Sequence, residues 1–448
     1  MAKGRKPLGT NRLIALVFLG VILLGTLLLL LPFASRNGRS CGVLTALFTS
    51  TSATCVTGLI LRDTWTQWSG FGQGVILALI EIGGLGFMSA ASLVIFALRR
   101  RVSYRQRMVM AQSIGVENVG DILRLQRGML IGCLSVQGIG AVILTLRFLA
   151  DYPFGRALKL GIFHAVSAFC NAGFDIMGFS GTGQSMARYH TDPVISLTLC
   201  ALIGIGGAGF LVWQELAHER RPRKWSVYTK LVLITSGVLL IGGAALICAA
   251  EWRNPATFGK LPFGEKLLAG LFQSATCRTA GFAGVDQGAL TETGKGISMF
   301  LMLIGGSSGS TAGGLKTVTF VVILLFLWTR ARGRQTVNVF HRTIPARQVL
   351  NALTIFGIMV GAAFFGGVFL TATSGVSFTD GLYESVSALA TVGVTTGVTP
   401  GLALPAHVLL MIYMYFGRVG VLTISLGFLA GSPGEEEFRY SETNLLIG

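Results

Sequence analysis

One short motif occurs four times in the chain, and each copy has a glycine at its next-to-last position. The copies are SATCVTGL (52–59), SAFCNAGF (167–174), ATCRTAGF (275–282) and SALATVGV (387–394), which align without gaps on Gly58, Gly173, Gly281 and Gly393. The four glycines follow one another at intervals of 115, 108 and 112 residues. Recurrence at a nearly constant period indicates four internal repeats.

Backbone carbonyl oxygens are the groups through which this motif could bind a cation. A dehydrated monovalent cation needs a cage of oxygen ligands, which rings of carbonyls supply in potassium channels. Turning carbonyls toward a common axis requires unusual φ and ψ values, and glycine adopts them without a Cβ clash. Thr391-Val392-Gly393 also resembles the start of the TVGYG filter of those channels. The less favoured interpretation is that these glycines only permit close helix packing.

We therefore expect four filter segments, one from each repeat, to form a single ion-binding ring. The expected filter residues are Val56, Thr57, Gly58, Asn171, Ala172, Gly173, Thr279, Ala280, Gly281, Thr391, Val392 and Gly393. Potassium at this filter is the only metal expected, because the seven cysteines are scattered and the five histidines show no ligand spacing.

A second glycine motif follows each filter segment. It reads EIGGLGF (81–87), GIGGAGF (204–210), LIGGSSGSTAGG (303–314) and YFGRVGV (415–421). The paired glycines of the first two copies favour close packing between helices. The third copy is rich in Ser, Thr and Gly, which are poor helix-interior residues, so we expect the helix to break there and line a wet cavity. Placed below the filter, a loop over 304–317 could obstruct the pore.

Charged residues inside apolar segments are functional candidates. Arg418 replaces the second glycine of the repeat motif and should project near the pore, below the filter; a structural ion pair with Glu81 or Glu384 is the alternative. Arg278 precedes Gly281 by three residues and is expected to support the filter backbone. Glu384, at the beginning of the fourth pore-helix region, is assigned the same role. Asp175 and Asp286 follow filter segments and could attract cations, although exposed loop acids are usually only solvated.

Long apolar segments must position these groups. Hydrophobic residues make up 52% of the 448-residue chain and charged residues 12%, which indicates a membrane protein. Eight segments are long enough to span a bilayer. They are 12–33, 71–98, 123–150, 193–217, 228–250, 296–328, 346–372 and 403–430. Shorter segments at 41–59, 157–174, 262–283 and 377–395 lie between the members of each pair and are predicted to be re-entrant pore helices followed by filter strands.

The predicted fold is thus an all-α polytopic membrane protein with four pseudo-symmetric repeats around one central pore. The repeats are 12–98, 123–219, 228–330 and 346–430, flanked by cytoplasmic termini at 1–11 and 431–448. Basic linkers at 99–107, 219–224 and 330–334 define the cytoplasmic side. The net charge of +17 reflects this bias and is not a nucleic-acid-binding signal.

The repeat layout, the four filter motifs and the interrupted sixth span resemble the Trk/Ktr/HKT superfamily of potassium transporters. The resemblance covers essentially the whole chain and is greatest to the KtrB branch, the membrane subunit of bacterial Ktr systems. It implies that the loop containing Gly305, Gly306, Ser307, Ser308, Gly309, Ser310, Thr311, Ala312, Gly313, Gly314 and Lys316 is the gate. It also implies that Arg418 faces that loop, and that glycine rather than serine at position 58 favours potassium.

The same resemblance implies a homodimer in the bacterial inner membrane, regulated by a cytoplasmic KtrA-type ring of RCK subunits. ATP or ADP would bind to that ring, because this chain carries no nucleotide motif or other cofactor site. The basic linkers at 99–107 and 330–342 would be docking surfaces for the ring.

We predict a potassium-conducting subunit that is not an enzyme. A sodium or mixed sodium/potassium conductor with the same fold is the alternative. A secondary active solute carrier is less favoured, because it predicts two halves with paired helix breaks. The sequence instead indicates four similar repeats and one break, in the third. A membrane enzyme would need clustered acidic or histidine residues near one membrane face, and no such cluster is evident.

Overall fold

The computed structural model describes residues 10–86, 122–179, 181 and 185–420. Its regular structure is almost entirely helical, as the sequence predicted, and the single sheet is the short hairpin of β1 and β2. The expected N-terminal extension, the basic linker 99–107, the tail 431–448 and the final parts of the expected spans 71–98 and 403–430 lie outside these residues.

The described chain contains the same succession of helices four times. Each unit has a first long helix, a second helix that ends just before a filter segment, and a third helix that follows the filter. The units are α1 (Thr10–Leu30), α2 (Val43–Thr54) and α4 (Gly70–Leu85); α7 (Ile122–Phe148), α8 (Phe154–Phe169) and α9 (Pro193–Ala208); α11 (Val227–Glu251), α12 (Phe263–Cys277) and α13 (Glu292–Leu303); and α15 (Ala346–Ser374), α16 (Phe378–Leu389) and α17 (Leu404–Val419).

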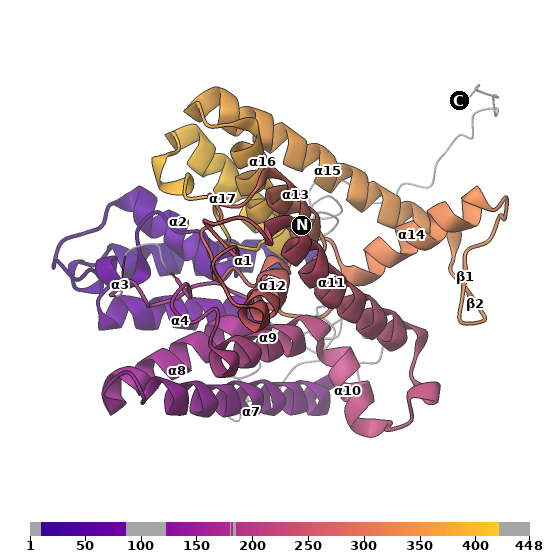
Figure 1. The fold of residues 1–448 in the computed structure, drawn as a ribbon, viewed down its shortest axis with the longest axis horizontal. Coiled ribbons are helices and arrows are strands. Elements are labelled where there is room, and N and C mark those ends of the chain that lie inside the picture. The colour runs from indigo at the N-terminus through magenta and orange to yellow at the C-terminus, as the bar shows by residue number, and fades with distance from the viewer. Residues whose placement is uncertain (1–9, 87–121, 180, 182–184, 421–448) are drawn as a thin grey trace, which may run out of the picture.

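Shorter elements connect these units. They are η1 (Pro32–Ala34), α3 (Thr64–Gln67), α10 (Phe210–His218), η2 (Pro222–Lys224), α14 (Thr317–Ala331), the antiparallel pair β1 (Asn338–Val339) and β2 (Arg342–Thr343), and η3 (Thr399–Gly401). In Figure 1, α10, α14 and the β1–β2 hairpin lie at one end of the molecule, and α3 lies at the opposite end.

Local sequence signals begin the helix that follows the filter in three of the four repeats. Ser69, Asp192 and Thr291 occupy the N-cap positions of α4, α9 and α13, where each side chain accepts a hydrogen bond from a backbone N–H of the first turn. Pro193 occupies the first turn of α9. A backbone N–H there would have no acceptor within the helix, so the lack of an N–H in proline costs no hydrogen bond. These caps fix where each helix leaves the outer loops.

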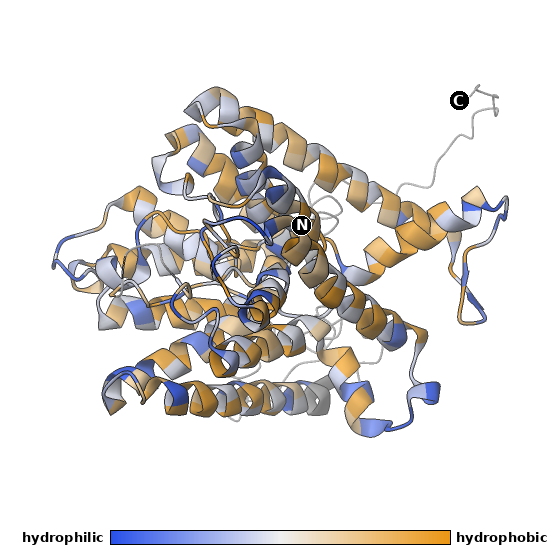
Figure 2. Ribbon diagram, viewed as in Figure 1, coloured by the Kyte–Doolittle hydropathy of each residue, from blue (hydrophilic) through white to orange (hydrophobic). Residues whose placement is uncertain are grey.

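The outer faces of the first helices are apolar and exposed. Leu27, Leu146, Ile241 and Phe364 on α1, α7, α11 and α15 are each at least 59% exposed. Figure 2 shows the same helices dominated by hydrophobic residues, with polar residues gathered toward the two ends of the molecule. A water-soluble protein does not expose so many large apolar side chains, so these faces are suited to lipid.

Three of the described helices are long and apolar enough to cross a membrane: α7, α11 and α15. A fourth span is counted if α9 and α10 are taken together. Four more apolar helices are shorter, in α1, α4, α14 and α17. Several expected spans are therefore present as shorter apolar helices.

In three of the four units, the third helix stops at a glycine in the middle of its expected span. Gly86, Gly209 and Gly420 have φ values of 79°, 88° and 93°, and α4, α9 and α17 end at the residue before them. After Gly209 the chain turns by 95° into α10. The prediction of a single break, confined to the third repeat, is wrong, because left-handed glycine terminates a helix even in an apolar sequence.

Candidate functional site: four convergent filter segments

The four pore helices all end at the same aligned position. Thr54, Phe169, Cys277 and Leu389 are the last residues of α2, α8, α12 and α16, and each lies four residues before its filter glycine. The carboxyl end of a helix carries a partial negative charge from its aligned peptide dipoles. Four such ends directed at one centre favour a cation there.

The filter backbone repeats one unusual conformation. Val56, Asn171, Thr279 and Thr391 have φ values between 52° and 66°, and the filter glycine two residues later also has a positive φ. Only three other non-glycine residues of the described chain have positive φ. In a regular strand, successive carbonyls point to opposite sides. When residues with positive φ alternate with residues of ordinary φ, successive carbonyls turn to the same side. The backbone therefore presents a row of oxygens in each repeat.

The four filter glycines meet in cyclic order. A Cβ on Gly58 would lie 2.6 Å from the carbonyl oxygen of Ala172, and one on Gly173 would lie 2.8 Å from that of Ala280. Likewise a Cβ on Gly281 would overlap the carbonyl oxygen of Val392, and one on Gly393 that of Thr57. Each repeat thus touches the next and the fourth touches the first. The expected filter residues do come together in one ring.

Hydroxyl groups on the pore helices hold the filter segments in place, a feature that the sequence analysis missed. Ser52 and Ser387 accept hydrogen bonds from the backbone N–H groups of Gly58 and Gly393, both at 3.0 Å. Ser167, Thr276 and Ser387 donate to carbonyls just beyond their filter glycines, each at 2.7 Å. A serine six residues before the filter glycine, present in three of the four repeats, is the sequence signal that could have revealed these hydrogen bonds.

A cavity of about 830 Å³ opens beyond the ring, and all four filter glycines line it. Asp175 and Asp286, which the sequence singled out, lie in its wall, together with Asp63, which it did not. Burial raises the pKa of Asp175 to about 6, despite a hydrogen bond from the backbone N–H of Met177 and with Asp63 contributing in the same direction. The cavity is an entrance with titratable negative charge.

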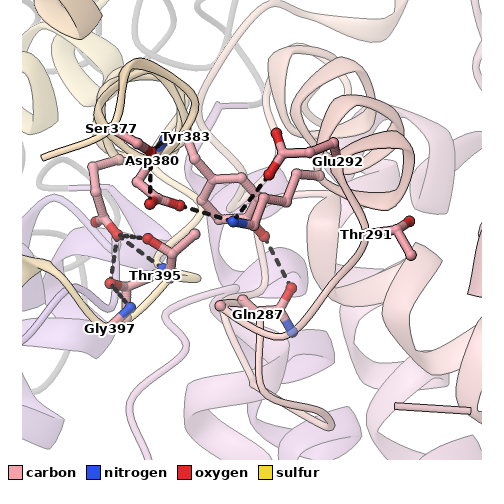
Figure 3. A network of polar contacts seen from close by, with 12 residues as sticks. Gln287, Thr291, Glu292, Ser377, Asp380, Tyr383, Thr395 and Gly397 are labelled. Carbon is pink, nitrogen blue, oxygen red and sulfur yellow. Dashed lines mark hydrogen bonds and ion pairs between the residues drawn. The ribbon is translucent and has the colours of Figure 1, made fainter. Parts of the chain in front are cut away.

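Glu384 supports the chain after the fourth filter segment, not the filter backbone itself. It lies in the middle of α16 and not at the beginning of the pore helix, as the sequence analysis had it. Its carboxylate accepts hydrogen bonds from Thr395, from the backbone N–H of Thr396 at 2.9 Å, and from Thr399. Figure 3 shows the link to Thr395, whose hydroxyl in turn accepts from the N–H of Gly397. The network fixes the rim of the entrance cavity.

The same region joins the third and fourth repeats. Lys295 of α13 lies 3.0 Å from the carboxylate of Asp380 and 3.6 Å from that of Glu292. Beside them, the Tyr383 hydroxyl donates to Gln287 at 2.9 Å. Figure 3 shows both contacts bridging α16 and the chain of the third repeat. These contacts tie the fourth pore helix, α16, to the third repeat.

Arg278 does not bind the filter backbone. Its guanidinium donates to the backbone carbonyl and the hydroxyl of Ser236, at 3.1 and 3.2 Å. Ser236 lies in the middle of α11, so the contact ties the end of the pore helix α12 to the first helix of its own repeat. The predicted support of the filter is therefore indirect, through the position of α12.

Residues 304–316 form a non-helical loop between α13 and α14, directly beneath the ring. A Cβ on Gly313 would overlap the Thr391 hydroxyl, so the loop touches the base of the fourth filter segment. The Thr311 hydroxyl donates to the carbonyl of Phe169 at 3.0 Å, at the end of the pore helix α8. The Lys316 ammonium donates to the carbonyl of Ala312 at 2.7 Å and closes the loop on itself.

Arg418 binds carbonyl groups of the loop and of α4. Its guanidinium donates to the carbonyls of Thr311, Gly83 and Gly84, the last at 3.0 Å. Neither Glu81 nor Glu384 is among its partners in the described chain, so the alternative of a structural ion pair is wrong. Glu81 instead accepts from Gln137, at 3.0 and 3.2 Å. Arg418 thus connects the loop to the first repeat.

The paired glycines of the third helices allow close packing on the pore helices, as expected. A Cβ on Gly83, Gly206 or Gly417 would overlap the last helical carbonyl of α2, α8 or α16. The loop glycines Gly305 and Gly306 are equally crowded, against Gly313 and Gly207. Any side chain here would push a helix away from the ring.

Comparison with known proteins gives consistent matches over the whole chain. The TrkH family model, described as cation transport protein, matches residues 14–440. The potassium/sodium uptake protein NtpJ of Enterococcus hirae is 38% identical, over 99% of this chain and 98% of that protein. The Ktr system potassium uptake protein B of Bacillus subtilis is 35% identical, over 98% and 96%.

A solved structure shares the fold. The crystal structure of the potassium transporter TrkH from Vibrio parahaemolyticus superimposes with a TM-score of 0.72 at 18% sequence identity, covering 95% of this chain and 86% of that one.

Proposed function

The chain belongs to the TrkH family of cation transport proteins, and on this premise we propose that it conducts potassium across the membrane through the ring of filter carbonyls. The family is one of transporters and not of enzymes. The observation that carries the proposal is the cyclic contact of Gly58, Gly173, Gly281 and Gly393, because it sets carbonyl oxygens from all four repeats around one axis. The ends of the pore helices and the acidic entrance favour a cation electrostatically.

The loop over 304–317 is the gate in this proposal, and Arg418 is its anchor. The loop lies beneath the filter and contacts Thr391 at its base. Arg418 also places a positive charge beside the path of the ion, which raises the barrier for cations while the loop is in place. Glu384 and Arg278 act as supports of the entrance rim and of α12.

The assembly is proposed from relatives. Ktr system proteins are named as parts of potassium uptake systems, so we expect a homodimer in the bacterial inner membrane that works with a KtrA-type RCK ring binding ATP or ADP. Both termini would be cytoplasmic. The linker 330–342, which includes β1 and the start of β2, is one expected docking surface for the ring. The other, at 99–107, lies outside the described residues.

A mixed sodium/potassium conductor is the second candidate, because the relative in Enterococcus hirae is named a potassium/sodium uptake protein. A solute carrier remains less favoured, although the argument from a single helix break no longer holds. The helix ends at Gly86, Gly209 and Gly420 recur at one aligned position in the first, second and fourth repeats. They therefore follow the fourfold pattern of a pore and not a pairing between two halves.

The test is growth on limiting potassium of a bacterium that lacks its own uptake systems, with the regulatory partner co-expressed. We compare the wild type with Gly58→Ser and Gly393→Ser. The matched control is Gly42→Ser, because Gly42 also has a positive φ but no atom within 4 Å of an added Cβ. We expect the wild type and the control to rescue growth, and the filter variants to lose preference for potassium over sodium.

Two outcomes contradict the proposal in different ways. If Gly58→Ser and Gly393→Ser keep the full preference for potassium over sodium, the filter has been assigned to the wrong residues. Failure of the wild type to rescue growth, despite membrane expression with its partner, would favour the sodium candidate.

A further inference from the structure

The tip of the loop, residues 307–309, is held by the elbow formed by α10 and the start of α11. The backbone N–H of Phe210, the first residue of α10, donates to the carbonyl of Gly309 at 3.1 Å. The hydroxyl of Tyr228, in the first turn of α11, donates to the carbonyl of Ser308 at 2.8 Å. Two consecutive loop carbonyls are thus bound by two helices of the same elbow.

The end of α9 binds the other side of the loop. The backbone N–H of Ser307 donates to the carbonyl of Gly207 at 2.9 Å, and its hydroxyl donates to the carbonyl of Ala208. The space at the turn is filled, because a Cβ on Gly209 would overlap the Ser307 hydroxyl. The 95° turn between α9 and α10 is therefore built around the loop tip.

Glu215 makes the elbow one unit. It lies on α10, and its carboxylate accepts hydrogen bonds from the hydroxyl of Ser226 at 2.7 Å, from the backbone N–H of Ser226 and from the hydroxyl of Thr229. Ser226 is the N-cap of α11, and Tyr228 is two residues further on. A movement of α10 must therefore carry Tyr228 with it.

We propose that Tyr228 is a positioning residue that latches the loop in its obstructing position, and that the α10–α11 elbow transmits movements of the cytoplasmic face to the pore. The inference rests on the proposed function of the loop. Tyr228 touches neither the ion path nor the filter; it acts through the carbonyl of Ser308. Withdrawal of the elbow releases the two hydrogen bonds at the loop tip. The middle of the loop stays bound, because Thr311 still contacts Arg418 and Phe169.

The test is rubidium uptake by the full-length chain, purified and reconstituted without its regulatory partner in vesicles of phosphatidylethanolamine and phosphatidylglycerol. Tyr228→Phe removes only the hydroxyl. We expect regulator-free uptake to rise about 2- to 12-fold, the effect of one neutral hydrogen bond on a two-state equilibrium. Glu215→Gln, which weakens the elbow at a distance, should change uptake in the same direction.

The matched control is Tyr413→Phe. The Tyr413 hydroxyl also donates to a backbone carbonyl, that of Ala362 at 2.6 Å, but between α17 and α15 and away from the loop. Its uptake should equal that of the wild type. Amide hydrogen exchange gives a second readout: Tyr228→Phe should speed exchange within 305–316 without affecting the pore helices.

The outcomes separate the two proposals. If wild-type vesicles conduct and Tyr228→Phe conducts no faster, with unchanged exchange in the loop, the latch is refuted and the proposed function stands. If vesicles of the wild type and of both elbow variants take up no rubidium, the conduction proposal fails and the latch falls with it.

Discussion

At the scale of single residues, charge is arranged so that its sign changes along the proposed ion path. Carboxylates of Asp63, Asp175 and Asp286 line the entrance cavity. On the other side of the ring lies the guanidinium of Arg418, bound to the loop carbonyl of Thr311. The carbonyl dipoles of the filter and the ends of the pore helices lie between these charges. Such an arrangement concentrates cations outside and opposes them where the path is obstructed.

The raised pKa of Asp175 predicts an effect of external pH on uptake. With a pKa of about 6, the carboxyl is ionised at pH 7.5 and gains a proton as the pH falls to 5, so the entrance loses one negative charge. We expect uptake at limiting potassium to fall about twofold across this interval, because a unit charge about 8 Å away through water is worth about 0.5 kcal/mol. Initial rates of rubidium uptake, measured at several external pH values, check this.

The control compares two aspartates of the same cavity. Asp175→Asn should behave at pH 7.5 as the wild type does at pH 5 and should lose the pH-dependent fall. Asp286→Asn should retain it. A fall that persists in Asp175→Asn would assign the titration to another group.

At the scale of elements, the recurring feature is a helix that packs against a pore helix and ends there. α4, α9 and α17 each bring a glycine onto the last helical carbonyl of α2, α8 and α16, and each ends three residues later at a left-handed glycine. The first glycine sets the distance between the helices, and the second ends the helix. This leaves room beneath the ring, which the loop from the third repeat occupies.

Substitution within α9 tests this packing with an internal control. Gly206→Ala places a Cβ onto the carbonyl of Phe169, whereas Gly204→Ala places one where no atom lies within 4 Å. We expect Gly206→Ala to lower stability by about 1–3 kcal/mol, the usual effect of overpacking. Gly204→Ala should be neutral or slightly stabilising, since alanine is the better helix former. Thermal unfolding of the detergent-solubilised variants measures both.

Equal stability of the two variants would mean that α8 and α9 can separate without cost. The close approach would then be incidental to the position of the filter.

At the scale of the whole molecule, the two ends differ in what they carry. The short helix α3 lies at one end, and α10, α14 and the β1–β2 hairpin lie at the other (Figure 1). The entrance cavity belongs to the first end, because Asp63 and Thr64 at the start of α3 line it. Arg330, Arg332 and Arg334 lie at the second end and are exposed. Basic residues favour the cytoplasmic side of a membrane, so the hairpin is expected inside the cell and the cavity outside.

Thiol labelling tests this orientation. Asn37 and Arg342 are both exposed, the first near η1 at the cavity end and the second in β2. In a background where the partly exposed Cys41 and Cys200 are replaced by serine, we expect Asn37→Cys to react with a membrane-impermeant maleimide in intact cells. Arg342→Cys should react only after permeabilisation. The reverse pattern would place the entrance cavity inside the cell and contradict the proposed orientation.

The sequence by itself determined what depends on local pattern. The fourfold repeat, the positions of the filter glycines, the helical class and the non-helical stretch after Leu303 follow from periodicity and from the conformational preferences of glycine, serine and threonine. These properties need no knowledge of distant contacts. The ion-binding role of the filter and the gating role of the loop stay predictions.

Only the tertiary structure decided which groups meet. Arg418 binds carbonyls of residues that are 107 and 335 positions away, and Tyr228 binds one that is 80 positions away. Arg278 reaches Ser236 and Glu384 reaches Thr395 and Thr399, because helix ends and not motif spacing set their surroundings. The partners of Arg418 and Tyr228 are backbone oxygens, which every residue carries, so no residue type marks them in a sequence. Packing selects them once the four repeats close around their axis.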